Sequence, residues 1–93
     1  MKIYIAGKIT GDPDYKQKFA RAQEQLEEGG HIVLNPALLP QKLRQQDYLR
    51  ICLAMLESAD MVAFLPDFEE SQGALIERDW CSYTNKLTMV LEG

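Results

Sequence analysis

The segment Ser71–Glu77, which reads Ser-Gln-Gly-Ala-Leu-Ile-Glu, combines a predicted helix start with a single acidic side chain one turn further in. It follows the apolar run Met61–Leu65, which is typical of a buried strand. The free N–H groups and the dipole of a helix start both favour a bound anion. The Glu77 carboxylate would lie close enough to act on the molecule bound there. This arrangement suits a transferase or hydrolase whose substrate is phosphorylated or glycosidic.

Glu77 lacks the neighbours of an ordinary solvated helix acid. With Ser71 as the N-cap, it lies beyond the first turn, where the helix dipole stabilises an acid. The residues three and four positions away offer no opposite charge to pair with it, and they are Gly73, Ala74, Trp80 and Cys81. A solvated acid remains the alternative, but these small and apolar neighbours favour a carboxylate with a role in catalysis.

Tyr4 is the second candidate for a catalytic role. It lies in the apolar run Ile3–Ala6, which predicts a first buried strand. Tyrosine in a central strand often only fills the core, yet its hydroxyl needs a hydrogen-bond partner when it is buried. Because Tyr4 comes two residues before the strand ends, its hydroxyl could point toward the helix that carries Glu77.

A loop with glycine at both ends follows this strand, and it consists of Gly7, Lys8, Ile9, Thr10 and Gly11. The ammonium group of Lys8 and the hydroxyl of Thr10 could bind a phosphate. An ordinary exposed turn explains the same residues equally well, because turns contain glycine routinely.

Four apolar runs predict strands and the amphipathic stretches between them predict helices. The strands are expected at 3–6, 32–34, 61–65 and 87–91, and the helices at 13–28, with Asp12 as N-cap, 47–58 and 72–84. Strands without polar alternation that are joined by helices indicate a parallel sheet covered on both faces. We therefore predict a three-layer α/β/α fold of the flavodoxin or Rossmann-like kind, with a four-stranded parallel sheet in the order 2-1-3-4.

In such a sheet, ligands bind at the carboxyl ends of the strands. The predicted site therefore draws on Tyr4–Gly11, on Asn35–Leu39 and on Pro66–Glu77. Asp60 lies at the opposite end of its strand, so we expect a structural role for it. The predicted second helix has an apolar arc too broad for one sheet face to cover, formed by Tyr48, Leu49, Cys52, Leu53, Met55, Leu56 and Ala59. We expect self-association into a homodimer or a larger homo-oligomer through part of this arc.

The 93 residues are enough for one domain, 1–93, and 46% of them are hydrophobic. A net charge of −4 speaks against binding to nucleic acid. The apolar runs fall short of the roughly 18 residues of a membrane span, so no membrane contact is expected. No signal peptide is visible, and Cys52 and Cys81 fit reduced thiols in a cytoplasmic protein. His31 is the single histidine, and we expect no metal and no cofactor.

Taken together, these motifs resemble the nucleoside 2-deoxyribosyltransferase-like superfamily, and most closely its small DUF4406-type branch. The resemblance covers nearly the whole chain. The segments that carry it are Met1–Gly7, Thr10-Gly11, Asn35–Ala37, Ala59-Asp60, Leu65-Pro66, Ser71–Gly73 and Glu77.

The resemblance implies that Glu77 is a nucleophile. It would attack the anomeric carbon of a 2-deoxyribose, expel the base and form a covalent glycosyl-enzyme, which water or a second base resolves. Tyr4 would hold that carboxylate in place. The residues implied or expected to bind the substrate are Gly7, Lys8, Ile9, Thr10, Gly11, Asn35, Ser71 and Gly73. Serine at position 71 favours a 5′-phosphorylated substrate within this resemblance.

The predicted function is thus hydrolysis or transfer at the N-glycosidic bond of a (deoxy)nucleoside or its 5′-monophosphate. Related sequences usually carry an aspartate where this chain has Cys52. If that aspartate protonates the leaving base, its loss removes general-acid help worth about 10²–10⁴-fold in rate. Two alternatives therefore stay open: a non-catalytic module that binds a nucleoside or nucleotide in the same pocket, and an interaction protein that uses the broad face of the second helix.

Overall fold

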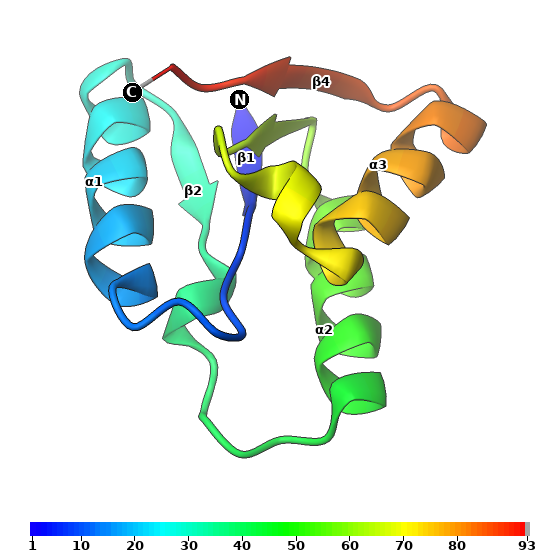
Figure 1. Cartoon of the computed structure of the whole chain (residues 1–93). Coiled ribbons are helices and arrows are strands. Elements are labelled where there is room, and N and C mark those ends of the chain that lie inside the picture. Colours follow the sequence, from blue (N-terminus) through cyan, green and yellow to red (C-terminus); the bar gives the residue numbers. More distant parts are fainter. Residues whose placement is uncertain (93) are drawn as a thin grey trace.

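Four parallel strands form one sheet in the order β2-β1-β3-β4, as the sequence predicts (Figure 1). The structure is a computed structural model, and it describes residues 1–92; Gly93, the last residue of the predicted domain, lies outside the described residues. The strands are β1 Lys2–Ala6, β2 Ile32–Leu34, β3 Met61–Phe64 and β4 Leu87–Val90, and the α-helices are α1 Tyr15–Glu28, α2 Gln45–Ser58 and α3 Gln72–Thr84. Two short 3-10 helices, η1 Pro36–Leu38 and η2 Phe68–Glu70, lie in the connections.

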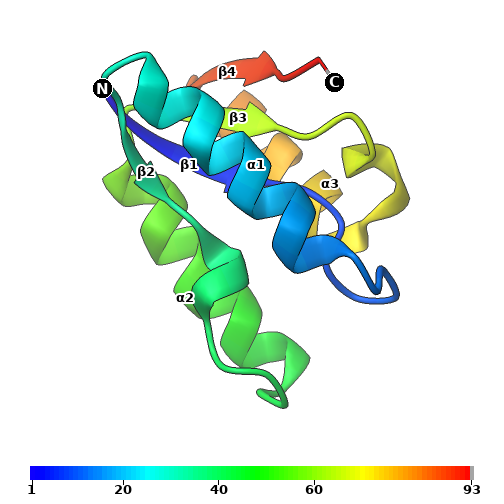
Figure 2. The same cartoon turned by 90° about the vertical axis from the view of Figure 1, so that its left-hand side faces the viewer.

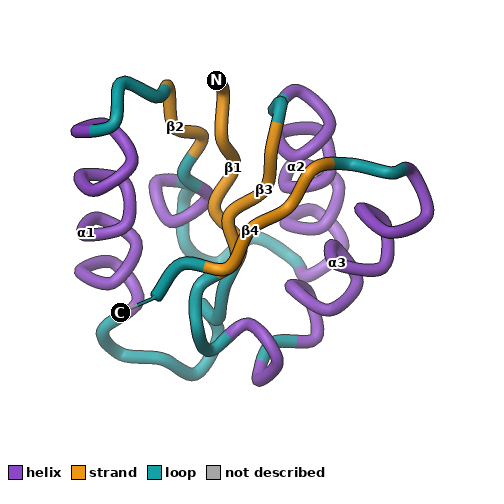
Figure 3. Tube along the Cα trace, turned by 90° about the horizontal axis from the view of Figure 1, so that it is seen from above, coloured by secondary structure: helices purple, strands orange, loops and turns teal. Residues whose placement is uncertain are grey.

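Helix α1 covers one face of the sheet, and α2 and α3 cover the other (Figure 3). The two faces of β1 show why. Ile3 and Ile5 pack with Phe19 of α1, whereas Tyr4 packs in a second cluster with Leu56 of α2. A strand that is buried on both faces needs apolar residues at every position, so β1 shows no polar alternation. The predicted three-layer α/β/α fold is therefore confirmed.

The strand register places the ends of β1 and β3 side by side. Ala6 is paired with Phe64, and Tyr4 is paired with Val62 two residues earlier. The chain segments that follow these two strands therefore leave the sheet next to each other, at the edge where ligands bind in parallel α/β sheets. At the opposite edge, the backbone N–H of Lys2 donates to Oδ2 of Asp60 over 2.8 Å. This hydrogen bond confirms the structural role expected of Asp60 and lowers the pKa of its carboxyl group.

Two helices begin at other residues than predicted. Helix α1 starts at Tyr15, with Asp14 as its N-cap, and not at Pro13. The carboxylate of Asp12 cannot cap the helix because its Oδ1 accepts from the backbone N–H of Asp14 and its Oδ2 accepts from Lys18. Helix α2 starts at Gln45, two residues earlier than predicted, and the predicted long loop before it contains η1.

The first turns of α2 extend beyond the sheet (Figure 2). Within one chain, Leu56 is the residue of this helix that is fully buried, and the other helical members of the apolar arc are only partly buried, namely Tyr48, Leu49, Cys52, Leu53 and Met55. The broad apolar arc of α2 therefore stays partly uncovered, and self-association through it remains a prediction. None of the helices described for residues 1–92 has both the length and the apolar character that a membrane span requires.

Candidate active site

Glu77 and Tyr4 meet between α3 and the centre of the sheet. The buried residues of α3 are Ala74, Glu77 and Cys81, at spacings of three and four, so helical periodicity turns Glu77 toward the sheet. The hydroxyl of Tyr4 donates to Oε2 of Glu77 over 2.5 Å. Glu77 is 5% exposed and Tyr4 is 1% exposed. The structure therefore brings together the two residues that the sequence predicts to be catalytic, although their roles remain predictions.

The surroundings of Glu77 disfavour its charged form. Burial raises the pKa of the Glu77 carboxyl group to about 7, although the hydrogen bond from Tyr4 acts in the opposite direction. Within residues 1–92, Glu77 forms no ion pair with a lysine, arginine or histidine. Burial, followed by the negative charge of Glu77, raises the pKa of Tyr4 well above its usual value. A carboxyl group that titrates near neutral pH in a buried position is typical of a functional site.

Two thiols flank this pair. Cys52 of α2 packs, half-buried, against the cluster that contains Tyr4. Burial raises the pKa of the Cys52 thiol; Tyr4 opposes this change and the charge of Glu77 adds to it. Cys81, one turn after Glu77, is buried, and burial together with the charge of Glu77 raises its pKa. Within residues 1–92, no three histidine, cysteine, aspartate or glutamate side chains are grouped as a metal site would need.

The start of α3 is built as the sequence predicts. Ser71 is the N-cap, and its Oγ accepts from the backbone N–H of Ala74 over 3.2 Å. Gly73 is exposed in the first turn, where an added Cβ would meet only Oγ of Ser71, at 3.8 Å. The fold therefore has room for a side chain at position 73, and glycine there leaves the backbone of the first turn open to a bound molecule.

The glycines of the loop after β1 have structural causes. A Cβ on Gly7 would lie 2.7 Å from Cδ1 of Leu65, so the close approach of this loop to the end of β3 requires glycine. Gly11 has a φ of +82°, which favours glycine as well. Ile9 packs against the α1 side of the core, whereas Thr10 is exposed. The structure therefore explains both glycines without a ligand, and the binding roles of the five loop residues remain predictions.

Lys18 of α1 ties this loop to the segment after β3, and the sequence analysis missed it. Its Nζ donates to the carbonyl oxygen of Lys8 over 2.8 Å, to Oδ2 of Asp12 over 2.5 Å, and to the carboxylate of Asp67. Burial lowers the pKa of Lys18, but the hydrogen bonds to the two carboxylates outweigh it and the pKa rises. A signal was present: Lys18 stands three residues after Tyr15, on the inward side of an amphipathic helix.

Further contacts join the two loops of the site directly. The backbone N–H of Lys8 donates to Oδ1 of Asp67 over 3.3 Å. The ammonium group of Lys8 lies 3.8 Å from Oε1 of Glu70. The predicted phosphate ligand Lys8 therefore already faces a carboxylate.

Asn35 lies on the other side of the sheet. Its Oδ1 accepts from the backbone N–H of Ala37 over 2.8 Å, and its Nδ2 donates to Oε1 of Gln23 in α1 over 2.9 Å. Asn35 is buried and caps η1. Since Glu77 lies on the face that α2 and α3 cover, the structure does not bring Asn35 together with the Glu77–Tyr4 pair, and its role in substrate binding remains a prediction.

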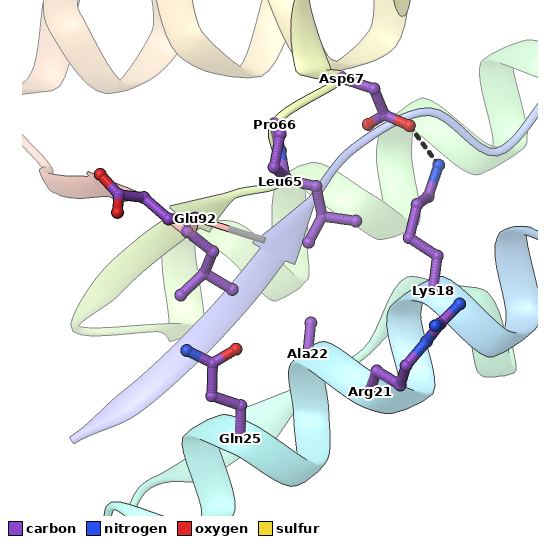
Figure 4. Close-up of a pocket in the computed structure, with 9 residues that line it drawn as sticks. Lys18, Arg21, Ala22, Gln25, Leu65, Pro66, Asp67 and Glu92 are labelled. Atoms are coloured by element: carbon purple, nitrogen blue, oxygen red, sulfur yellow. Dashed lines mark hydrogen bonds and ion pairs between the residues drawn. The ribbon is translucent and has the colours of Figure 1, made fainter.

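Two surface cavities lie on the side of the sheet that α1 covers. One, of about 330 Å³, lies between α1 and the ends of β3 and β4, with Lys18 and Asp67 among its walls (Figure 4). The other, of about 360 Å³, lies beside η1 and is lined in part by Asn35. Neither of these cavities is lined by Glu77, so neighbouring side chains cover the carboxylate in this conformation.

Residues 1–90 match the family model described as a domain of unknown function, DUF4406. This chain belongs to the DUF4406 family. The predicted membership of the DUF4406 type is thereby confirmed.

Among solved structures, this DUF4406 protein is similar to one described as a 2-deoxyribosyltransferase from the psychrotolerant bacterium Bacillus psychrosaccharolyticus. The TM-score is 0.76 at 19% sequence identity, and the match covers 97% of this chain and 71% of that chain. At this level of identity the two proteins share a fold. No match is found among curated proteins.

Proposed function

We propose that this DUF4406 protein is an N-deoxyribosyl hydrolase or transferase that cleaves an N-glycosidic bond through a covalent glutamyl-glycosyl intermediate. The observation that carries the proposal is the buried Glu77 carboxyl group, which Tyr4 holds by a 2.5 Å hydrogen bond and which forms no ion pair with the described residues. The similarity of its fold to that of a 2-deoxyribosyltransferase supports the choice of a nucleoside substrate.

The proposed reaction has two displacements. Because Oε2 of Glu77 accepts from Tyr4, the other oxygen, Oε1, attacks the anomeric carbon. The bond from that carbon to the base nitrogen breaks, and its electron pair leaves with the base. Water or the nitrogen of a second base then attacks the anomeric carbon and releases the carboxylate. Two inversions at one carbon retain its configuration.

The surroundings of Glu77 fit the role of a nucleophile. Burial removes water from the carboxylate, and Tyr4 keeps it in one orientation. Because the nucleophile must be ionised and the pKa of Glu77 is about 7, we expect the rate to rise with pH through this value.

The test is to incubate the protein with 2-deoxynucleosides and their 5′-monophosphates and to follow the release of free base by chromatography. Glu77→Gln, which keeps the size of the side chain and removes the nucleophile, should lose about 10³-fold or more in rate. Protein that is denatured during turnover should carry a pentosyl adduct on the peptide with Glu77, detected by mass spectrometry. Base release that persists unchanged in Glu77→Gln would remove this residue from the reaction.

A non-catalytic binding module is the second candidate, and Cys52 favours it. Cys52, whose thiol has a raised pKa, stands where related sequences usually carry an aspartate that could protonate the leaving base. Such a module would gain thermal stability from nucleosides or nucleotides without releasing any base. Base release that depends on Glu77 would contradict it.

We also propose that the protein self-associates through α2, because the apolar arc of this helix is only partly covered within one chain. Burying it against a second copy would remove that apolar surface from water. A strictly monomeric species in sedimentation velocity would contradict this proposal.

A further inference from the structure

The groups around Glu77 restrict how a leaving base can be protonated, and this restriction depends on the proposed function. The titratable side chains that act on Glu77 or respond to its charge are Tyr4 of β1, Cys52 of α2 and Cys81 of α3. The hydroxyl proton of Tyr4 is already donated to Glu77 over 2.5 Å, so it is not available to a base. Cys81 is 2% exposed under α3 and cannot reach a substrate.

Cys52 therefore remains as the side chain beside the pair that could donate a proton. A thiol holds its proton more tightly than a carboxylic acid does. Burial and the charge of Glu77 raise the pKa of this thiol further. A neutral base that leaves through this site receives no effective general-acid help from the side chains that act on Glu77, and such help is worth about 10²–10⁴-fold in rate.

The rim of the site is rich in negative charge. Five carboxylates lie in the two connections that meet there, and they are Asp12, Asp14, Asp67, Glu69 and Glu70. The ammonium groups described at this rim are already paired: Lys18 with Asp12 and Asp67, and Lys8 with Glu70. At the first turn of α2, Arg44 and Asp47 pair with each other. A phosphate at this rim would meet more carboxylates than ammonium groups.

An aromatic ring lies in the same region. Phe68 of η2 is half-buried and, like Cys52, packs against the cluster that contains Tyr4, with its ring centroid 5.0 Å from that of Phe64. Aromatic faces and carboxylates both attract a flat ring that carries positive charge. The Phe68 ring and the carboxylates at the rim thus both favour a flat, positively charged ligand.

We propose that the substrate is an N-glycoside without a 5′-phosphate whose base is a cationic heterocycle, such as a pyridinium or an N7-alkylated purine. In this reaction Oε1 of Glu77 forms a bond to the anomeric carbon while the bond to the ring nitrogen breaks. The electron pair of that bond neutralises the positive nitrogen, so the base leaves as a neutral molecule and needs no proton. Water then attacks the anomeric carbon, its proton passes to solvent, and the Glu77 carboxylate is released.

The first test measures cleavage of the 2′-deoxyribosides of nicotinamide and 7-methylguanine, which are cationic, against 2′-deoxyguanosine and 2′-deoxyinosine, which are neutral. Each rate is divided by the uncatalysed rate of the same compound, because cationic bases also leave faster in water. We expect rate enhancements for the cationic pair to be about 10²-fold larger or more. The 5′-monophosphate of nicotinamide 2′-deoxyriboside, which adds a phosphate, should be cleaved about ten-fold less efficiently than the deoxyriboside because of the carboxylates at the rim. Enhancements that are equal or larger for the neutral nucleosides would overturn the inference.

The second test supplies the missing acid. Cys52→Asp should raise the cleavage of 2′-deoxyguanosine and 2′-deoxyinosine at least about ten-fold and leave that of nicotinamide 2′-deoxyriboside unchanged or lower. Cys52→Asn is the matched control, since it has the same size and no acidic proton. A gain for both substrate classes in Cys52→Asp, or for neither, would contradict the inference.

A binding measurement on the wild-type protein tests the preference for a cation, because it requires neither turnover nor a substituted variant. N1-methylnicotinamide and nicotinamide differ by one methyl group and one positive charge, and neither has a glycosidic bond. Calorimetry should show tighter binding of the cation, and this preference should grow between pH 6 and pH 8 as Glu77 ionises. Equal affinity at pH 8 would overturn the inference.

Cleavage that depends on Glu77 but favours neutral nucleosides would overturn the inference and leave the proposed function intact. Cleavage of every class of nucleoside by Glu77→Gln would overturn the proposed function.

Discussion

Glu77 and Lys18 both point inward from their helices near the same edge of the sheet, but they are compensated differently. Lys18 donates to two carboxylates and one carbonyl oxygen, and it is only partly buried. Glu77 is 5% exposed and receives one hydrogen bond, from the neutral hydroxyl of Tyr4. The structure satisfies the charge of Lys18 and leaves that of Glu77 largely uncompensated.

This difference separates a structural charge from a functional one. A lysine between two carboxylates holds loops together, and its charge is stabilised when the protein folds. A buried carboxylate without a cation costs free energy, so a fold that keeps one needs another reason for it. Substitution of Glu77 or Lys18, or of a residue beside one of them, tests this difference.

The largest effect on stability is expected from Glu77→Gln. The folded-state pKa of Glu77 is about 7 against an unfolded value of 4.5, so the folded protein holds this proton more tightly. The free energy of unfolding should therefore fall as pH rises from about 4.5 to about 7 and change little above. Glu77→Gln removes this loss and should be more stable than the wild type at pH 8, by on the order of 3 kcal/mol at most.

Denaturant unfolding of both proteins at pH 4 and pH 8 measures the effect. At pH 4 the carboxyl group is protonated in both states, so the two proteins should unfold at similar denaturant concentrations. A Glu77→Gln variant that is less stable than the wild type at pH 8 would show that the carboxylate is structural, and the contrast with Lys18 would disappear.

Tyr4→Phe should have the next largest effect. The hydroxyl of Tyr4 favours the charged form of Glu77, so its removal should raise the pKa of Glu77 above about 7. The acidic limb of the pH–rate profile should move to higher pH, and the rate at pH 7 should fall about ten-fold. A lower rate with an unchanged profile would mean that Tyr4 only packs in the core.

Lys18→Met should lower the stability of the fold and leave the pH dependence of the reaction unchanged. The variant keeps the length of the side chain but loses the contacts with Asp12 and Asp67, and we expect a loss of about 1 kcal/mol in the free energy of unfolding. The acidic limb of the pH–rate profile should stay at the pKa of Glu77, because Lys18 does not act on it. Lys18→Arg, which keeps the charge, is the control. A shift of the pH–rate profile in Lys18→Met would show that Lys18 acts on Glu77 and that the two belong to one site.

Much of this arrangement could be predicted from the sequence because it depends on local patterns. Uninterrupted apolar runs predict the four parallel strands, and the order of the sheet follows the prediction. Tyr4 and Glu77 meet because each stands at an inward position of its element, Tyr4 two residues before the end of a strand and Glu77 in the second turn of a helix.

Contacts made by long or capping side chains were not predictable in the same way. Lys18 reaches Asp67, 49 residues away, across a gap that depends on how α1 sits on the sheet. Asp12 was predicted to cap α1, but its carboxylate accepts a hydrogen bond from Lys18, and the helix starts later. Asn35 follows β2 as predicted, yet the turn of η1 directs its side chain toward Gln23 on α1. In each case the side chain contacts a partner that no local sequence pattern predicts.

The smallest effect is expected from Gly73→Ala, and it tests whether the start of α3 serves the site. The added Cβ would meet only Oγ of Ser71, at 3.8 Å, so the helix should gain about 0.5 kcal/mol from the lower backbone freedom of alanine. If a substrate approaches this backbone, kcat/KM should fall about ten-fold at the same time. Gly7→Ala is the contrasting variant, because its Cβ would lie 2.7 Å from Leu65 and should destabilise the fold by about 1–3 kcal/mol. An unchanged kcat/KM in Gly73→Ala would mean that the substrate reaches Glu77 by another path than the first turn of α3.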